Sequence, residues 1–327
     1  MSRFIPTALI FFATNCLGTQ LVRTDEFPLT LDNITIRDPF IHADASTETY
    51  YLYAQTGNRK DGRGSGVGVE VYRSRDLVRW SEPELVFKRP DEFWGGEEIW
   101  APEMHKLGKQ YYLFVSLNGR EGGRGTQILR ADSPAGPFEV FSPKANTPPE
   151  QRSLDGTPFI DPNGQNWMVY CHEWVQIGDG AMRAVAMADD WSDRLDEPIH
   201  LFSASDAPWA KPLGMREGKY VTDGCFLHRL KSGHLLMLWS TFTGEKGRTY
   251  AVGIAHSESD TIRGPWKHEP EPIFAGNGGH PMLFRTFDGQ FTLALHQPNS
   301  GEPARVKLFR LAEARGTLKI TPWNPPL

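Results

Sequence analysis

Apolar, β-rich runs recur along the chain, and residues that favour turns flank each of them. In chain order the clearest runs are Tyr50–Thr56, Gln110–Ser116, Asn166–Trp174, His234–Phe242 and Gln290–His296. Most of them follow a glycine-containing turn by one or two residues, as in the segments LGKQ, KSGH and FDGQ. A turn of this kind before such a run predicts that the run is the second strand of a β-hairpin.

The first strand of each hairpin is also recognisable. The five segments read IRDPFI, WAPEMHKL, DGTPFID, TDGCFLHRL and GGHPMLFR. Their spacing of roughly 60 residues leaves room for about four short strands in each unit, which is typical of a β-propeller. Helical periodicity is nearly absent, and a β-sandwich would not repeat one strand–turn–strand phrase five times. The sequence therefore predicts an all-β fold, a five-bladed β-propeller.

Composition narrows the class of protein. The chain has 327 residues and a formal net charge of -5. A chain of this length can form one large domain, and we expect a single propeller over residues 30–327. Without a basic excess to neutralise phosphates, nucleic acid is not expected as a partner.

The N-terminal residues resemble an export signal. Arg3 precedes the apolar run IPTALIFFA, which is long enough for a signal peptide and too short to span a bilayer. We expect a signal peptide over residues 1–20 and a secreted or periplasmic protein; the alternative is a buried first strand. No other segment is apolar enough for a transmembrane span, so no membrane association is expected.

Acidic side chains and one histidine stand at similar points of the five first strands. They are Asp38, Glu103, Asp155, Asp223 and His280. The innermost strands of a propeller line its centre, so these side chains are expected to converge. Burying several carboxylates together is costly unless they act on a ligand or an ion. Convergent carboxylates whose pKa values differ are what acid–base hydrolysis of a glycosidic bond requires.

At these residues the chain resembles glycoside hydrolase family 43, a group of five-bladed propellers that act mainly on arabinose- and xylose-containing polysaccharides. The resemblance extends from about Ile34 to about Leu311. It rests on IRDPFI, IWAPEMHKLGKQYYLF, LDGTPFID, VTDGCFLHRLKSGHLLMLW and GGHPMLFRTFDGQ, which follow the order of the family.

The resemblance implies a role for each matching residue. Asp38 corresponds to the general base that activates a water, and Asp155 to the carboxylate that orients the acid and raises its pKa. Asp223 stands at the position of the general acid. His280 corresponds to a histidine that in many members helps to hold a calcium or sodium ion with waters. No cofactor is implied for the chemistry itself.

Two positions depart from the family pattern. The acid is usually a glutamate in the phrase Glu-Gly-Pro, whereas this chain reads Asp223-Gly224-Cys225. Aspartate is one methylene shorter, so Glu173 and then Glu103 are kept as alternative acids. Pro281 follows His280 where a glycine is expected.

The leading hypothesis is an inverting glycoside hydrolase that acts as a monomer on a polysaccharide or oligosaccharide. Trp100, Glu103 and Glu173 are expected to contact the substrate. The family favours an exo-acting arabinofuranosidase or xylosidase over an endo-arabinanase. Two alternatives remain: a retaining hydrolase of the fructan type, and a non-catalytic glycan-binding propeller.

Overall fold

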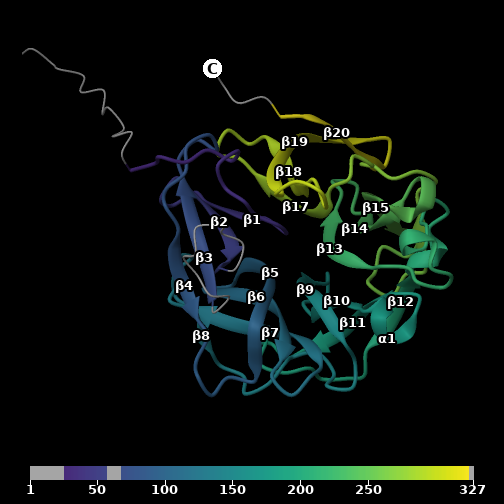
Figure 1. Cartoon of the computed structure of the whole chain (residues 1–327), viewed down its shortest axis with the longest axis horizontal. Coiled ribbons are helices and arrows are strands. Elements are labelled where there is room, and N and C mark those ends of the chain that lie inside the picture. The colour runs from purple at the N-terminus through teal and green to yellow at the C-terminus, as the bar shows by residue number, and fades with distance from the viewer. Residues whose placement is uncertain (1–25, 57–67, 324–327) are drawn as a thin grey trace, which may run out of the picture.

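The computed structural model describes residues 26–56 and 68–323, and within these ranges the chain forms five antiparallel sheets of four strands each. The sheets follow one another around a ring, and the first strand of each lies nearest the centre (Figure 1). The predicted five-bladed β-propeller is thereby confirmed. The proposed signal peptide at residues 1–20 falls outside the described residues. The described part contains no helix long and apolar enough to cross a membrane.

Each blade runs outward from its first strand to its fourth. The innermost strands are β1 (Phe40–Asp44), β5 (Gly95–Leu107), β9 (Ser153–Ile160), β13 (Asp223–Arg229) and β17 (Gly279–Arg285). The second strands are β2 (Thr49–Gln55), β6 (Gln110–Gly119), β10 (Asn166–His172), β14 (Leu235–Thr243) and β18 (Phe291–Gln297). The third strands are β3 (Gly68–Ser74), β7 (Arg124–Ala131), β11 (Ala181–Met187), β15 (Thr249–Ser257) and β19 (Arg305–Ala314). The outer strands are β4 (Glu84–Lys88), β8 (Glu139–Val140), β12 (Ile199–Ser203), β16 (Trp266–His268) and β20 (Thr317–Pro322).

The predicted hairpin strands agree with the second strands except at one end. The run Asn166–Trp174 leaves the sheet at His172, and a single helical turn, α1 (Trp174–Ile177), follows. The Glu173 N–H still donates to the Arg152 carbonyl, one residue beyond the paired strands, before the helical turn begins. Apolarity alone does not show this departure, because Trp174 and Val175 suit a strand as well as a helix. Three short 3₁₀ turns, η2 (Ala204–Asp206), η3 (Leu213–Met215) and η4 (Glu245–Gly247), lie in the loops.

The hydrophobic core lies between neighbouring blades. Both faces of the second strand of each blade are covered for most of its length, and strand β10 is buried at every position and reads as a continuous apolar run. Trp80 in the first blade and Trp239 in the fourth are both fully buried. The Trp239 ring lies 5.6 Å from that of Trp209, between the third and fourth blades.

Because Gly253 on β15 has no side chain, the Trp209 ring can pack directly against the backbone there. A Cβ atom at Gly253 would lie 2.0 Å from Cζ2 of Trp209. We expect Gly253→Ala to lower the free energy of unfolding by about 1–3 kcal/mol, because the indole must move within a packed core. Urea denaturation measures the loss. In a Trp209→Phe background the same change should cost less, and an equal cost in both backgrounds would contradict this account.

The ring closes where the first blade meets the fifth. The Ile36 N–H donates to the Ala304 carbonyl, and the Arg305 guanidinium donates to the Thr35 hydroxyl. Arg37 donates to the backbone carbonyl and to the side-chain oxygen of Asn299, at 2.7 and 2.6 Å. Side-chain and backbone hydrogen bonds therefore join residues that are more than 260 positions apart in the sequence.

Candidate active site

The innermost strands share a local backbone feature that positions the site. In each blade one residue on the innermost strand, or just before it, has a left-handed backbone, with φ between 44° and 55°. In four of the blades a shift of the pairing register accompanies it, as in a β-bulge. The left-handed residues are Asp38, Ala101, Asp155, Gly224 and His280. Non-glycine residues in this region are uncommon and cluster at functional sites.

A side chain of the preceding blade stabilises most of these bulges. The Asp155 N–H donates to the Ser116 hydroxyl at 2.7 Å, and the His280 N–H donates to the Ser240 hydroxyl at 2.8 Å. Nδ1 of His296 lies 3.2 Å from the backbone nitrogen of Asp38 and 3.1 Å from its Oδ1. The two hydroxyl contacts satisfy backbone donors that the sheet leaves unpaired, so a side chain of the preceding blade helps to fix the left-handed residue that follows.

A pocket of about 230 Å³ lies among these bulges. Three of the left-handed residues line it, together with four of the residues that precede a left-handed residue. The lining comprises Arg37, Asp38, Gln55, Trp100, Leu154, Asp155, Asp223, Tyr250 and His280. The structure thus brings together four of the polar residues that the sequence singles out, Asp38, Asp155, Asp223 and His280.

Asp38 is held as a carboxylate. Its Oδ1 lies 3.2 Å from Nδ1 of His280 and 3.1 Å from Nδ1 of His296. Burial alone would raise the pKa of Asp38, but the two imidazoles outweigh it and hold that pKa well below its usual range. An ionised carboxylate with a partly exposed edge can accept a proton from a water in the pocket.

Asp155 lies in a more enclosed environment. Its Oδ2 accepts the Gly224 N–H at 2.8 Å, and the Ser116 hydroxyl lies 3.4 Å from its Oδ1. Burial raises the pKa of Asp155, and the nearby carboxylates of Asp223 and Asp38 raise it further, whereas His280 opposes them. Because Gly224 follows Asp223 directly, Asp155 fixes the backbone that carries the candidate acid.

Asp223 keeps its proton to a higher pH than a free aspartate does. Burial raises its pKa to about 6, although the Tyr250 hydroxyl donates to its Oδ2 at 3.0 Å and so favours the carboxylate. Asp223 is not at the left-handed position of its blade. It stands one residue earlier, where the other blades have Arg37, Trp100, Leu154 and Gly279. The shorter acid thus enters the pocket from a shifted backbone position.

His280 connects two of the carboxylates. Its Nδ1 lies 3.2 Å from Oδ1 of Asp38 and 3.7 Å from Oδ2 of Asp155. Burial opposes a charge on this imidazole, but the two carboxylates raise its pKa to about 10. The opposite nitrogen, Nε2, is buried and has no hydrogen-bond partner.

Nε2 of His280 could bind the predicted ion only after losing its proton, and then only as a single protein ligand with waters completing the shell. Among residues 26–56 and 68–323 no three His, Cys, Asp or Glu side chains are grouped so that they could hold a metal. A calcium or sodium ion beside His280 stays a prediction. Such an ion would supply positive charge near the three carboxylates.

The other candidate residues lie around the pocket. Trp100 lines it, and the Arg124 guanidinium covers its ring at 4.2 Å. Glu173 is not among the lining residues; it forms an ion pair with Arg124 and lies 3.7 Å from Nε of Arg152. Glu103 is also outside the lining, and its Oε2 is 3.0 Å from Nε2 of His105. These contacts give both glutamates partners other than the substrate.

Sequence reasoning missed several lining residues. Arg37 and Leu154 could have been found by aligning the five bulges, since both occupy the place that Trp100 and Asp223 hold in their blades. Tyr250 lies on a third strand and Gln55 at the end of a second strand, where no repeated phrase points to them. The side-chain oxygen Oε1 of Gln55 is buried without a partner and can accept a substrate hydroxyl.

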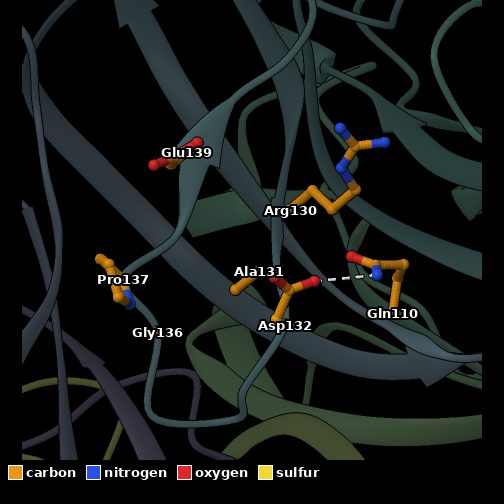
Figure 2. A pocket seen from close by; sticks show the side chains of 7 residues that line it. All are labelled: Gln110, Arg130, Ala131, Asp132, Gly136, Pro137 and Glu139. Carbon is orange, nitrogen blue, oxygen red and sulfur yellow. Dashed lines mark hydrogen bonds between the residues drawn. The ribbon is translucent and has the colours of Figure 1, made fainter.

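A second cavity, of about 490 Å³, lies on the second blade (Figure 2). Its lining includes Arg130, Asp132 and Glu139, and the Gln110 amide donates to Asp132 at 2.9 Å. Gln110 begins β6 at the hairpin end opposite Trp100, so this cavity opens away from the carboxylates. It is larger than the pocket at the bulges but has no comparable set of catalytic groups.

Comparison with known proteins identifies a family and several relatives. The sequence model described as "Glycosyl hydrolases family 43" matches residues 33–312. An extracellular exo-α-(1→5)-L-arabinofuranosidase of Cellvibrio japonicus is 22% identical over 84% of this chain and 82% of its own length. An α-L-arabinofuranosidase B of Pyricularia oryzae is also 22% identical, and the match spans 63% of this chain but only 43% of that protein. The chain thus spans less than half the length of some curated relatives.

A solved structure resembles the whole ring. The endo-arabinase of Bacteroides thetaiotaomicron is 36% identical, with a TM-score of 0.81, and the match covers 89% of this chain and 99% of that one. A family 43 β-xylosidase/α-arabinofuranosidase from a compost metagenome is 18% identical with a TM-score of 0.64, which shows the shared fold.

Proposed function

The chain belongs to glycosyl hydrolase family 43, and from this premise we propose that it hydrolyses glycosidic bonds in arabinose- or xylose-containing glycans with inversion at the anomeric carbon. Arabinose-containing glycans are the first choice, because an endo-arabinase shares 36% identity over nearly its whole chain. The relatives from Cellvibrio japonicus and Streptomyces chartreusis are named extracellular, which supports export of this protein.

One observation carries the proposal: two carboxyl groups of one pocket have pKa values shifted in opposite directions. His280 and His296 outweigh the burial of Asp38 and keep it ionised, whereas burial keeps Asp223 protonated in weakly acidic solution. Such a pair can remove one proton and donate another in the same step. A scaffold or a simple binding module does not need two carboxyl groups with opposite pKa shifts, so these shifts favour a catalytic role.

The reaction then proceeds in one displacement. Asp38 accepts a proton from a water as the water oxygen forms a bond to the anomeric carbon. The bond from that carbon to the leaving oxygen breaks, and Asp223 donates its proton to this oxygen. Asp155 holds the Gly224 backbone and so orients Asp223. Trp100 and Gln55, on the walls of the pocket, are placed to contact the sugar.

Inversion is supported by the positions of the two groups in the ring. Asp38 precedes the first strand of blade one and Asp223 begins the first strand of blade four, with the fifth blade between them (Figure 1). Inverting glycosidases separate their carboxyl groups by about 6.5–9.5 Å to admit a water, and retaining enzymes by about 5–5.5 Å. Groups from blades that are not adjacent favour the wider spacing.

The test is a screen on debranched arabinan, aryl arabinofuranoside and aryl xyloside, with proton NMR of the first product formed. We expect hydrolysis of an arabinose-containing substrate and a first product of inverted configuration. A first product that keeps the substrate configuration would exclude inversion and favour the retaining mechanism of fructan-type enzymes. No turnover of any of these substrates would contradict the proposed function.

A further inference from the structure

Tyr250, which lines the pocket, is held in position by contacts on several sides. It is 2% exposed, and its hydroxyl donates to Oδ2 of Asp223 at 3.0 Å. One neighbour is the His296 imidazole, which is stacked on the ring at 5.7 Å with an interplanar angle of 19°. At Gly279 a Cβ atom would lie 2.3 Å from Cε1 of Tyr250, so only glycine leaves room for the ring.

This contact distinguishes the two oxygens of Asp223. Burial keeps the Tyr250 phenol protonated, because it raises the pKa of this group well above its usual range. The phenol therefore acts as a donor, and Oδ2 of Asp223 is the acceptor. The carbonyl oxygen of a carboxylic acid accepts hydrogen bonds better than its hydroxyl oxygen does, so this contact favours Oδ1 as the oxygen that carries the transferable proton of Asp223.

We propose that Tyr250 is a positioning residue that turns Asp223 so that Oδ1 presents the proton to the leaving oxygen. The inference rests on the proposed function, in which Asp223 is the general acid. It also offers a reason why an aspartate can serve in a position where the resemblance leads one to expect glutamate. A shorter side chain cannot adjust its reach by an extra rotation, so a fixed partner must set its orientation.

The same ring connects the acid to the base. His296, against which Tyr250 is stacked, has its Nδ1 3.1 Å from Oδ1 of Asp38. Displacing Tyr250 would therefore disturb the packing beside the base as well as the contact to the acid. Removing only the hydroxyl separates these effects, because phenylalanine retains the stacked ring.

The Tyr250→Phe variant should alter proton donation without weakening substrate binding. We expect kcat on arabinan oligosaccharides to fall about 10- to 100-fold, in line with the loss of one hydrogen bond to a charged or reacting group, while KM changes little. Aryl arabinofuranosides with activated leaving groups should lose much less, since they need no proton. The hydroxyl favours the ionised form of Asp223, so the pKa of Asp223 should rise and the basic limb of the pH profile should move to higher pH.

Other charged groups face Asp223 and stay unchanged in this variant. They come from the neighbouring blades and from the rim, and they are Asp38, Asp155, Glu173 and His280. A shift of the basic limb in Tyr250→Phe is therefore assigned to the lost hydroxyl.

The control is Tyr53→Phe, which removes the hydroxyl of another fully buried tyrosine whose partner, the Pro134 carbonyl, lies outside the pocket. It should keep the wild-type pH profile and leaving-group dependence. Gly279→Ala is a second variant that retains the hydroxyl but displaces the ring, and it should reproduce the change in leaving-group dependence. If Tyr250→Phe and Gly279→Ala both behave as wild type, the inference fails while the proposed function stands.

A readout without turnover separates the two proposals. Carbon-13 NMR of labelled aspartate follows the titration of Asp223 in the wild type and in Tyr250→Phe, with Asp223→Asn to assign the signal. If the wild type hydrolyses none of the glycosides, the proposed function fails. The inferred Tyr250–Asp223 contact is then supported by an upward shift of the Asp223 pKa in Tyr250→Phe, and an unchanged pKa overturns it.

Discussion

Replacing Asp38 with asparagine is expected to lower kcat/KM on arabinan oligosaccharides by about 10²–10⁴-fold, because the water then has no base to accept its proton. Asparagine has nearly the same shape and tolerates the left-handed backbone that Asp38 adopts, with φ of 49°. The variant should therefore fold. Initial rates combined with circular dichroism separate a loss of chemistry from a loss of structure.

Asp260→Asn is the matched control for that experiment. Asp260 also has a left-handed backbone, with φ of 58°, but it lies on the fourth blade, where it contacts His234 at 2.5 Å outside the pocket. We expect the activity of the Asp260→Asn variant to stay near that of the wild type. Near-normal turnover by Asp38→Asn would exclude Asp38 as the base and with it the single-displacement mechanism.

Truncating Asp223 should produce a loss that depends on the leaving group. We expect Asp223→Ala to lose about 10²–10⁴-fold on arabinan oligosaccharides and far less on activated aryl arabinofuranosides, because only the former need protonation of the leaving oxygen. The wild-type enzyme should lose activity as the pH rises through about 6, the pKa to which burial raises Asp223. This basic limb should be absent from Asp223→Ala.

Glu173→Ala is the comparison that decides between the two candidate acids. Glu173 pairs with Arg124, whose guanidinium covers the Trp100 ring, so its loss should affect both substrate classes to a similar extent. Leaving-group dependence in the Glu173 variant alone would transfer the role of acid to Glu173.

The five-bladed ring could be predicted from the sequence because the features that specify it are local and recur along the chain. Apolar runs of seven to nine residues recur in every unit, most of them after a glycine-containing turn, and each blade repeats one antiparallel pattern. The convergence of Asp38, Asp155 and His280 followed from the same repetition. All three prove to be left-handed residues at equivalent places.

The details of the site depend on contacts between blades that no repeat reveals. Glu103 appeared to match the other acids, but Ala101 holds the left-handed position of its blade, and Glu103 stands two residues later. Tyr250 contacts the proposed acid, Asp223, from the third strand of the fourth blade, and His296 contacts the proposed base, Asp38, from the second strand of the fifth. These contacts join residues that are far apart in the sequence, and a repeat pattern does not predict such contacts.

The seam between the first and fifth blades has a consequence for the order in which activity appears during synthesis. Asp38 is among the first described residues to leave the ribosome, whereas His280 and His296, which keep it ionised, follow more than 240 residues later. A nascent chain that ends before the fifth blade contains the proposed acid and the proposed base but lacks both imidazoles. We therefore expect hydrolysis only from a chain whose ring has closed. Proteolytic removal of the fifth blade should abolish turnover even where the strands of the other four blades are retained.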